Sequence, residues 1–237
     1  MRTDGRAADE MRKVKATLGF SKFAEGSCLI EVGDTMVLCN ASVEERVPPH
    51  VTSGGWVTAE YSMLPRANRE RSKRDISKLK LSVRSAEIQR LIGRSLRSAT
   101  DLEALGQRTI TIDCDVLQGD GGTRTASVTG GFIALALACR RLMEQGKITQ
   151  MPLRTYVSGI SAGIVRNEAL LDLCYEEDSR AMVDLNCVMT AEGDIIELQA
   201  TGEGRPFTPE EQRRLIALCR KGNAVLTQMQ RRCLGEL

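Results

Sequence analysis

Hydrophobic and polar positions alternate in several short stretches of the chain, which is the period of half-buried β-strands. In the first half of the chain this alternation predicts strands at 27–31, 35–43, 56–62 and 109–116. Gly33 and Asp34 separate the first two strands, and this pair suits a tight hairpin turn. In the second half the pattern predicts strands at 157–165, 169–174, 182–190 and 194–200.

A helical period predicts helices at 85–102, at 125–145 and from Pro209 onward. Residues 132–139 are apolar on every side of the second helix, which places that helix in the core. The last helix begins with a capping box, Thr208 with Glu211. Its predicted apolar stripe consists of Leu215, Leu218, Val225, Leu226 and Met229.

These elements interleave without the strict alternation of a doubly wound sheet, so the pattern predicts the α+β class. Residues 1–237 are expected to form a single domain of two tightly joined halves, with the join near 146–155. Residues 68–80 are too charged to bury and are expected to form an exposed loop.

Composition narrows the cellular setting and the chemistry. The 237 residues are 42% hydrophobic and 27% charged, as in soluble globular proteins. Residues 1–20 lack the apolar core of a secretory signal, and no apolar run approaches the ~20 residues of a membrane span, so we expect a cytoplasmic protein without membrane contact. The cysteines lack the close pairs of zinc and redox motifs. A single histidine, His50, excludes HExxH metalloprotease sites.

Charge is strongly divided along the chain. Residues 66–97 carry eleven Lys/Arg and three acids, whereas residues 172–203 carry nine acids and one arginine. A basic pole suits phosphate backbones, and an acidic pole can hold divalent cations.

The first candidate site is the glycine-rich segment 118–127, between a predicted strand and the apolar helix. Such a turn exposes backbone N–H groups at a helix N-terminus, and Thr123 and Arg124 add donors, which together favour an anion. A plain glycine turn that caps the helix is the alternative. Arg124 favours anion binding because an unpaired cation in the first turn opposes the helix dipole.

The second candidate is Arg84, which helical geometry places along the apolar stripe near a helix start. Arg90, Arg94 and Arg97 fall on the opposite side and are expected to form a solvated face. Arg84 could hold a ligand anion or form a structural salt bridge, and the pattern leaves both interpretations open.

The third candidate is the acidic pair Asp178 and Asp184, across the entry to a predicted strand. Asp184 and Asn186 share one face of that strand. Two carboxylates in this position could share a Mg²⁺ or handle a proton, and solvated surface acids are the alternative.

Several longer segments carry a resemblance to a known family. They are MRTDGR at 1–6, CNASVE at 39–44, RVPP at 46–49, TAEYSMLPR at 58–66, EIQRLIGR at 87–94, IDCDV at 112–116, DGGTRTAS at 120–127 and YEEDS at 175–179. Together they resemble the RNase PH family, its bacterial members in particular. The resemblance implies an RNase PH-like fold of mixed sheets packed with helices, in a homohexameric ring built as a trimer of dimers. It also implies a phosphorolytic 3′→5′ exoribonuclease that trims tRNA precursors, with inorganic phosphate as co-substrate and Mg²⁺ as cofactor.

The resemblance also assigns roles to residues. Arg84, Gly122, Thr123 and Arg124 match phosphate-binding positions, and Asp178 and Asp184 match the acidic pair linked to metal binding and catalysis. Arg66, Arg71 and Arg74 fall where family members contact tRNA and neighbouring subunits. Two departures concern the loop 50–55, which is shorter than the family pattern, and residues 78–83, which replace a glycine-rich stretch.

Two other functions compete with this reading. A non-catalytic RNA-binding ring subunit is the first, but the phosphate arginines and the acidic pair are all present. A hydrolytic metallonuclease is the second, but it leaves the anion loop and Arg84 without a role.

Overall fold

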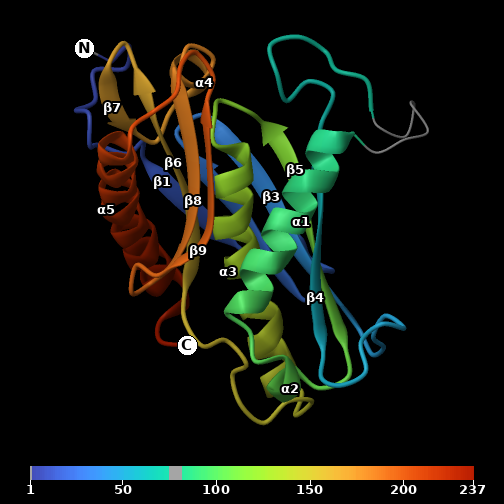
Figure 1. Cartoon of the computed structure of the whole chain (residues 1–237). Helices are drawn as coiled ribbons and strands as arrows, with labels where there is room; N and C mark the ends of the chain where they lie inside the picture. The colour runs from blue at the N-terminus through green and yellow to red at the C-terminus, as the bar shows by residue number, and fades with distance from the viewer. Residues whose placement is uncertain (1, 75–81) are drawn as a thin grey trace.

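The computed structural model describes residues 2–74 and 82–237, whose strands form two sheets (Figure 1). The first sheet has the order β1-β2-β3-β5-β4. Its strands are β1 (Val14–Leu18), β2 (Gly26–Val32), β3 (Thr35–Glu44), β4 (Trp56–Met63) and β5 (Thr109–Gln118). Its neighbouring strands are antiparallel except β4 and β5, which run parallel.

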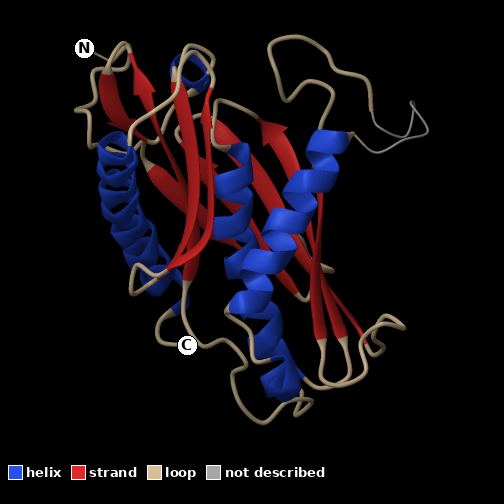
Figure 2. Ribbon diagram, viewed as in Figure 1, coloured by secondary structure: helices blue, strands red, loops and turns tan. Residues whose placement is uncertain are grey.

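The second sheet is antiparallel, with the order β7-β6-β8-β9. Its strands are β6 (Val157–Val165), β7 (Glu168–Leu171), β8 (Val183–Thr190) and β9 (Ile195–Gly202). The helices are α1 (Val83–Ser98), α2 (Leu102–Leu105), α3 (Thr123–Glu144), α4 (Tyr175–Asp178) and α5 (Pro209–Leu234). The α+β class is therefore confirmed, and Figure 2 shows its mixed helices and strands.

Helix α3 is the centre of the core. It packs against β2 and β3 of the first sheet and against β6 of the second, so it lies between the sheets. Its length and apolar composition would also suit a membrane span, but most of its residues are buried inside the protein. Helix α1 covers β4, and α5 packs against β6 and β7 on the other face of the second sheet.

Close approach between α3 and β2 depends on small residues. A Cβ atom at Gly26 would lie 1.9 Å from the Ala134 carbonyl oxygen, and one at Gly130 would lie 2.7 Å from Ile30 Cγ2. These glycines allow the helix to seat directly on the sheet, which fixes where the helix N-terminus lies.

Three predicted elements are corrected by the structure. The helix predicted at 85–102 ends at Ser98, because Thr100 bridges Leu153 and Asp101 caps the separate helix α2. The strand predicted at 169–174 ends at Leu171, and α4 follows it. Val225, placed in the apolar stripe of the last helix, is 45% exposed.

Other differences are at the edges of the fold. Strand β1 was not predicted, because an edge strand whose outer side chains meet water has a weak hydrophobic pattern. The predicted loop 68–80 is exposed over most of its described part, and residues 75–80 of it lie outside the described residues. Residues 78–83 differ from the glycine-rich stretch of the family pattern, and residues 78–81 of this segment also lie outside the described residues.

Gly26→Ala should destabilise the protein by roughly 1–3 kcal/mol or more, because the added methyl group meets backbone atoms of α3 that cannot rotate away. Urea unfolding measures the loss. Gly204→Ala is the matched control, since a Cβ there meets no heavy atom closer than 3.7 Å. Equal stability of the two variants would contradict the close packing of β2 on α3.

Candidate phosphate and acidic site

One cavity of about 360 Å³ collects the phosphate and acidic candidates predicted from the sequence. Its predicted lining residues are Arg84, Gly122, Thr123, Arg124, Asp178 and Asp184. Its other lining residues are Ser161, Ser179, Ala181, Asn186 and Glu203. The lining residues come from both halves of the chain: Arg84 precedes α3 in the sequence, the group 122–124 is at its N-terminus, and the others follow the helix.

The glycine loop leads into α3 without a side-chain cap. Gly121 and Gly122 have φ angles of 77° and 66°, in the left-handed region that favours glycine. A Cβ at Gly121 would lie 2.5 Å from the Leu173 carbonyl oxygen, so the loop also needs glycine for space. Gly122 is the N-cap of the helix and provides no side-chain acceptor. The first N–H groups of α3 and its dipole therefore favour an anion beside Gly122.

Thr123 adds an oriented hydroxyl to this end of the helix. Its Oγ1 lies 2.8 Å from the hydroxyl of Tyr61, a β4 residue that is 3% exposed. Burial raises the pKa of Tyr61, so its hydroxyl stays protonated at neutral pH. The sequence analysis did not identify Tyr61, because an aromatic residue on a strand is typical of a core position.

Arg124 is held loosely and keeps its positive charge available. Its Nη1 donates to Gln199 Oε1 at 3.0 Å and lies 3.8 Å from Glu87 Oε1. Arg84 makes no ion pair with any described carboxylate, so the salt-bridge interpretation of Arg84 finds no support within residues 2–74 and 82–237. The two guanidinium groups thus present positive charge to the same cavity.

The carboxylates face the arginines from the second half of the chain. Asp178 ends α4, and Asp184 lies on β8, where Asn186 Nδ2 donates to its Oδ2 at 3.1 Å. Burial and then repulsion by Asp178 raise the pKa of Asp184 to about 6. Burial also raises the pKa of Asp178, although Arg84 and Arg124 oppose that rise.

These carboxylates fit a divalent cation. Asp184 Oδ1 is buried without a hydrogen-bond partner among the described residues, and an adjacent like charge is the environment that a cation relieves. The described part of the chain has no cluster of three or more His, Cys, Asp or Glu side chains of metal-binding type. A Mg²⁺ ion would therefore take one or two carboxylates and complete its shell with water or substrate oxygens, as this ion commonly does.

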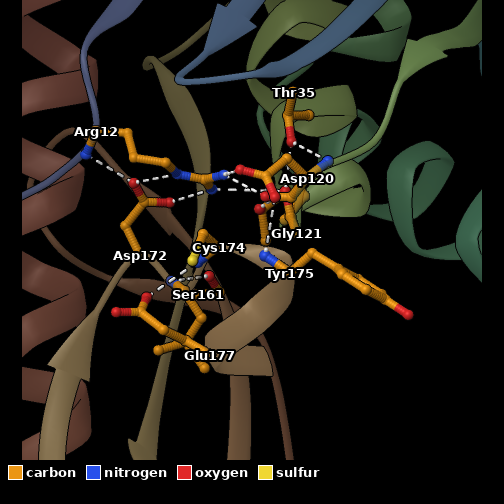
Figure 3. Close-up of polar contacts among 12 residues, drawn as sticks. Arg12, Thr35, Asp120, Gly121, Ser161, Asp172, Cys174, Tyr175 and Glu177 are labelled. Carbon is orange, nitrogen blue, oxygen red and sulfur yellow. Dashed lines mark hydrogen bonds and ion pairs between the residues drawn. The ribbon is translucent and has the colours of Figure 1, made fainter. Parts of the chain in front are cut away.

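A buried ion cluster next to the glycine loop was not predicted, and Figure 3 shows the part of it around Arg12 and Asp172. Arg2 and Arg12 of the N-terminal segment pair with Glu177 and Asp172, and Arg12 also reaches the carbonyl groups of the glycine loop. The sequence offered only weak signals for this cluster: scattered charges in the first twelve residues, and Arg2 within a segment that resembles the family.

The remaining predicted residues lie elsewhere. Arg66, Arg71 and Arg74 are exposed on the segment after β4, and none of them lines the cavity. The prediction of a solvated Arg97 is wrong, because its guanidinium lies 4.2 Å from the centre of the Trp56 ring and donates to the Val57 carbonyl oxygen at 2.7 Å.

Comparison with known proteins identifies the class that this fold and site define. Residues 10–140 match the 3′ exoribonuclease family, domain 1, and residues 155–222 match domain 2 of the same family. The two matches cover most of the chain. The chain therefore belongs to the 3′ exoribonuclease family, the family of RNase PH.

Solved structures share the fold. An Archaeoglobus fulgidus exosome with RNA bound to the active site matches with a TM-score of 0.83 at 24% identity, over 96% of this chain and 91% of that chain. Rice (Oryza sativa) Rrp46 matches with a TM-score of 0.77 at 19% identity, over 98% and 100% of the two chains. An archaeal exosome core matches with a TM-score of 0.75 at 22% identity, over 99% and 91%. Because these identities are all below 25%, the similarity to these structures establishes the fold alone.

Asp184→Asn should stabilise the protein at neutral pH. A pKa raised from 3.8 to about 6 means that the folded protein resists ionisation of Asp184, so stability falls as the pH rises through this interval. At pH 8, without Mg²⁺ or phosphate, we expect the variant to gain on the order of 2 kcal/mol in urea unfolding, and the gain should narrow toward pH 5. The exposed-turn variant Asp34→Asn is the control. A gain that does not change with pH would contradict the assigned pKa.

Proposed function

We propose that this chain is a phosphorolytic 3′→5′ exoribonuclease of the bacterial RNase PH type, which trims 3′ ends of tRNA precursors and releases nucleoside diphosphates. The observation that carries the proposal is the cavity itself. It brings an uncapped helix N-terminus and two arginines together with a carboxylate pair. That arrangement suits an attacking inorganic phosphate beside a cation and a phosphodiester.

Phosphorolysis explains why no activated nucleophile is found among the described residues that line the cavity. Inorganic phosphate arrives already ionised, so no Ser, Cys or His has to lose a proton first. His50 lies edge-on to the Trp56 ring, with 5.1 Å between ring centres, and is not among the residues that line the cavity. Catalysis then consists mainly of positioning and charge neutralisation.

The lining groups that were predicted from the sequence each have a task in this scheme. Arg84, Arg124, the Thr123 hydroxyl and the N–H groups that follow Gly122 would hold the attacking phosphate. Asp178 and Asp184 would hold Mg²⁺, which when bound would neutralise charge on the scissile phosphate. In the protonated state favoured by its raised pKa, Asp184 could instead donate a proton to the departing 3′-oxygen.

RNA affinity is assigned to the exposed basic segment. Arg66, Arg71 and Arg74 would bind backbone phosphates and so position the strand without reading its sequence. The relatives named above include an exosome with RNA bound to its active site. We extend the proposal to a cytoplasmic homohexamer, a trimer of dimers, in which these arginines also contact neighbouring subunits.

The deciding experiment is digestion of a tRNA with a short 3′ extension, with Mg²⁺, in the presence and absence of inorganic phosphate. Nucleoside diphosphates that appear only with phosphate are the expected products. Monophosphates released without phosphate would establish hydrolysis by water instead. RNA that is bound but not shortened would establish a non-catalytic ring subunit.

Arg124→Ala should raise the KM for phosphate by roughly 10- to 100-fold, because each lost charge-assisted hydrogen bond is worth about 1.5–3 kcal/mol. Steady-state assays with varied phosphate measure the change. Arg141→Ala is the matched control, since Arg141 is an exposed residue near the other end of the same helix. An Arg124→Ala enzyme with unchanged phosphate dependence would remove Arg124 from the phosphate site.

Replacing Arg66, Arg71 and Arg74 with Gln should lower RNA affinity and flatten its salt dependence. Each lost contact to a single strand should reduce the slope of log K against log salt by about 0.7. Fluorescence anisotropy measures the slope, and light scattering at the same concentrations separates loss of the ring from loss of contacts. The control is the equivalent triple change on α5, at Arg213, Arg214 and Arg220. An unchanged slope would place RNA elsewhere.

A further inference from the structure

Arg12 lies at the junction of three segments that are distant in sequence (Figure 3). It precedes β1, is 8% exposed, and contacts both the glycine loop at 120–121 and Asp172 beyond β7. It does not line the cavity. An arginine so deeply buried is retained only where its hydrogen bonds are satisfied, so its partners indicate its role.

Arg12 binds the carboxylate of Asp172 through three hydrogen bonds. Its Nε and Nη2 donate to the two carboxylate oxygens at 3.0 and 2.7 Å, and its backbone N–H donates to Oδ2 at 2.8 Å. Asp172 has a left-handed φ of 53°, and its N–H donates to the Ser161 carbonyl oxygen at 2.7 Å. Burial alone would lower the pKa of Arg12, but its hydrogen bonds to Asp172 and the negative charges of Asp172 and Asp120 together raise that pKa. The fork is therefore permanently charged and fixed in direction.

Arg12 also binds carbonyl groups of the glycine loop. Its Nη1 donates to the Asp120 carbonyl oxygen, and its Nη2 donates to that of Gly121 at 3.5 Å. Thr35 Oγ1 donates to the same Gly121 carbonyl oxygen at 2.7 Å. In a trans peptide the C=O and the following N–H point in opposite directions. Holding these carbonyls toward Arg12 therefore turns the N–H groups of Gly121 and Gly122 away from it.

We propose that Arg12 is the positioning residue of the phosphate site. It holds the carbonyl groups of the glycine loop toward itself. The N–H groups of Gly121 and Gly122 then point away from Arg12, so that they and Arg124 are aligned for an anion. A Cβ at Gly122 would lie 3.3 Å from Arg12 Nη2, so the guanidinium lies directly against the N-cap residue of α3. This inference rests on the proposed function, because it supposes that the anion at α3 is the phosphate co-substrate.

Arg2 provides a matched comparison inside the same cluster. It is 7% exposed and binds Glu177 through two hydrogen bonds of 2.7 Å, so its burial and its forked pairing with one carboxylate match those of Arg12, which has a further ion pair of 3.7 Å with the Asp120 carboxylate of the glycine loop. Its other hydrogen bonds go to carbonyl oxygens of Ala7, Glu10 and Asp172, and none among the described residues goes to the glycine loop. If the cluster were purely structural, substitution of either arginine should have the same effect on phosphate binding. A positioning role predicts a loss of phosphate binding for Arg12 alone.

The experiment compares Arg12→Lys with Arg2→Lys. Lysine keeps the charge but cannot hold a carboxylate and two carbonyl groups with one planar fork. We expect both variants to unfold at lower temperature. Only Arg12→Lys should weaken inorganic phosphate binding, by roughly tenfold or more, in calorimetric titration without RNA. In the exonuclease assay the loss should appear in the KM for phosphate more than in kcat.

Thr35→Val keeps the test decisive if Arg12→Lys does not fold. It removes the second hydrogen bond to the Gly121 carbonyl oxygen with almost no change in volume, and we expect it to weaken phosphate binding in the same direction. Phosphate affinity that is unchanged in Thr35→Val, or that falls equally in Arg12→Lys and Arg2→Lys, would overturn the positioning role. A wild-type protein that neither binds phosphate nor releases diphosphates would overturn the proposed function itself.

Discussion

The site depends on one constraint: the N-terminus of α3 must remain uncapped while the rest of the helix is buried. Helix α3 packs between the two sheets, with glycines of β2 and of the helix allowing direct contact. A buried helix cannot shift to satisfy its first N–H groups, and Gly122 gives them no side-chain acceptor. The cavity at this end of the helix therefore combines two arginines, which favour an anion, with a carboxylate pair.

Opposite charges meet at this point. The basic and acidic stretches of the sequence look like separate poles, but the fold brings Arg84 and Arg124 to the same cavity as Asp178 and Asp184. The burial that raises the pKa of both carboxylates also leaves Asp184 Oδ1 without a hydrogen-bond partner among the described residues. Such an arrangement lowers the stability of the protein without a ligand, but it favours the binding of charged groups.

Sequence reasoning found six of the cavity residues because each of the six carries a local signal. Glycines between a strand and an apolar helix, an arginine on an apolar stripe, and acids at a strand entry can each be recognised within a short window. Arg12 and Asp172 could not be found in this way, since their pairing spans 160 positions and depends on how the halves pack. Elements without strong periodicity, such as β1 and α4, escaped for a related reason: their formation depends on neighbours rather than on their own pattern.

The ion cluster of the N-terminal segment has a consequence for folding order. Arg2 and Arg12 are made first during synthesis, but their partners Asp172 and Glu177 emerge from the ribosome more than 150 positions later. Contacts of such long sequence separation form late, because a large loop must close before they stabilise anything. The glycine loop therefore gains its contacts with an oriented Arg12 only after Asp172, which follows β7 of the second sheet, is in place. A chain synthesised only as far as α3 would lack Asp172, and its glycine loop would then miss the ion pair that orients Arg12 toward it.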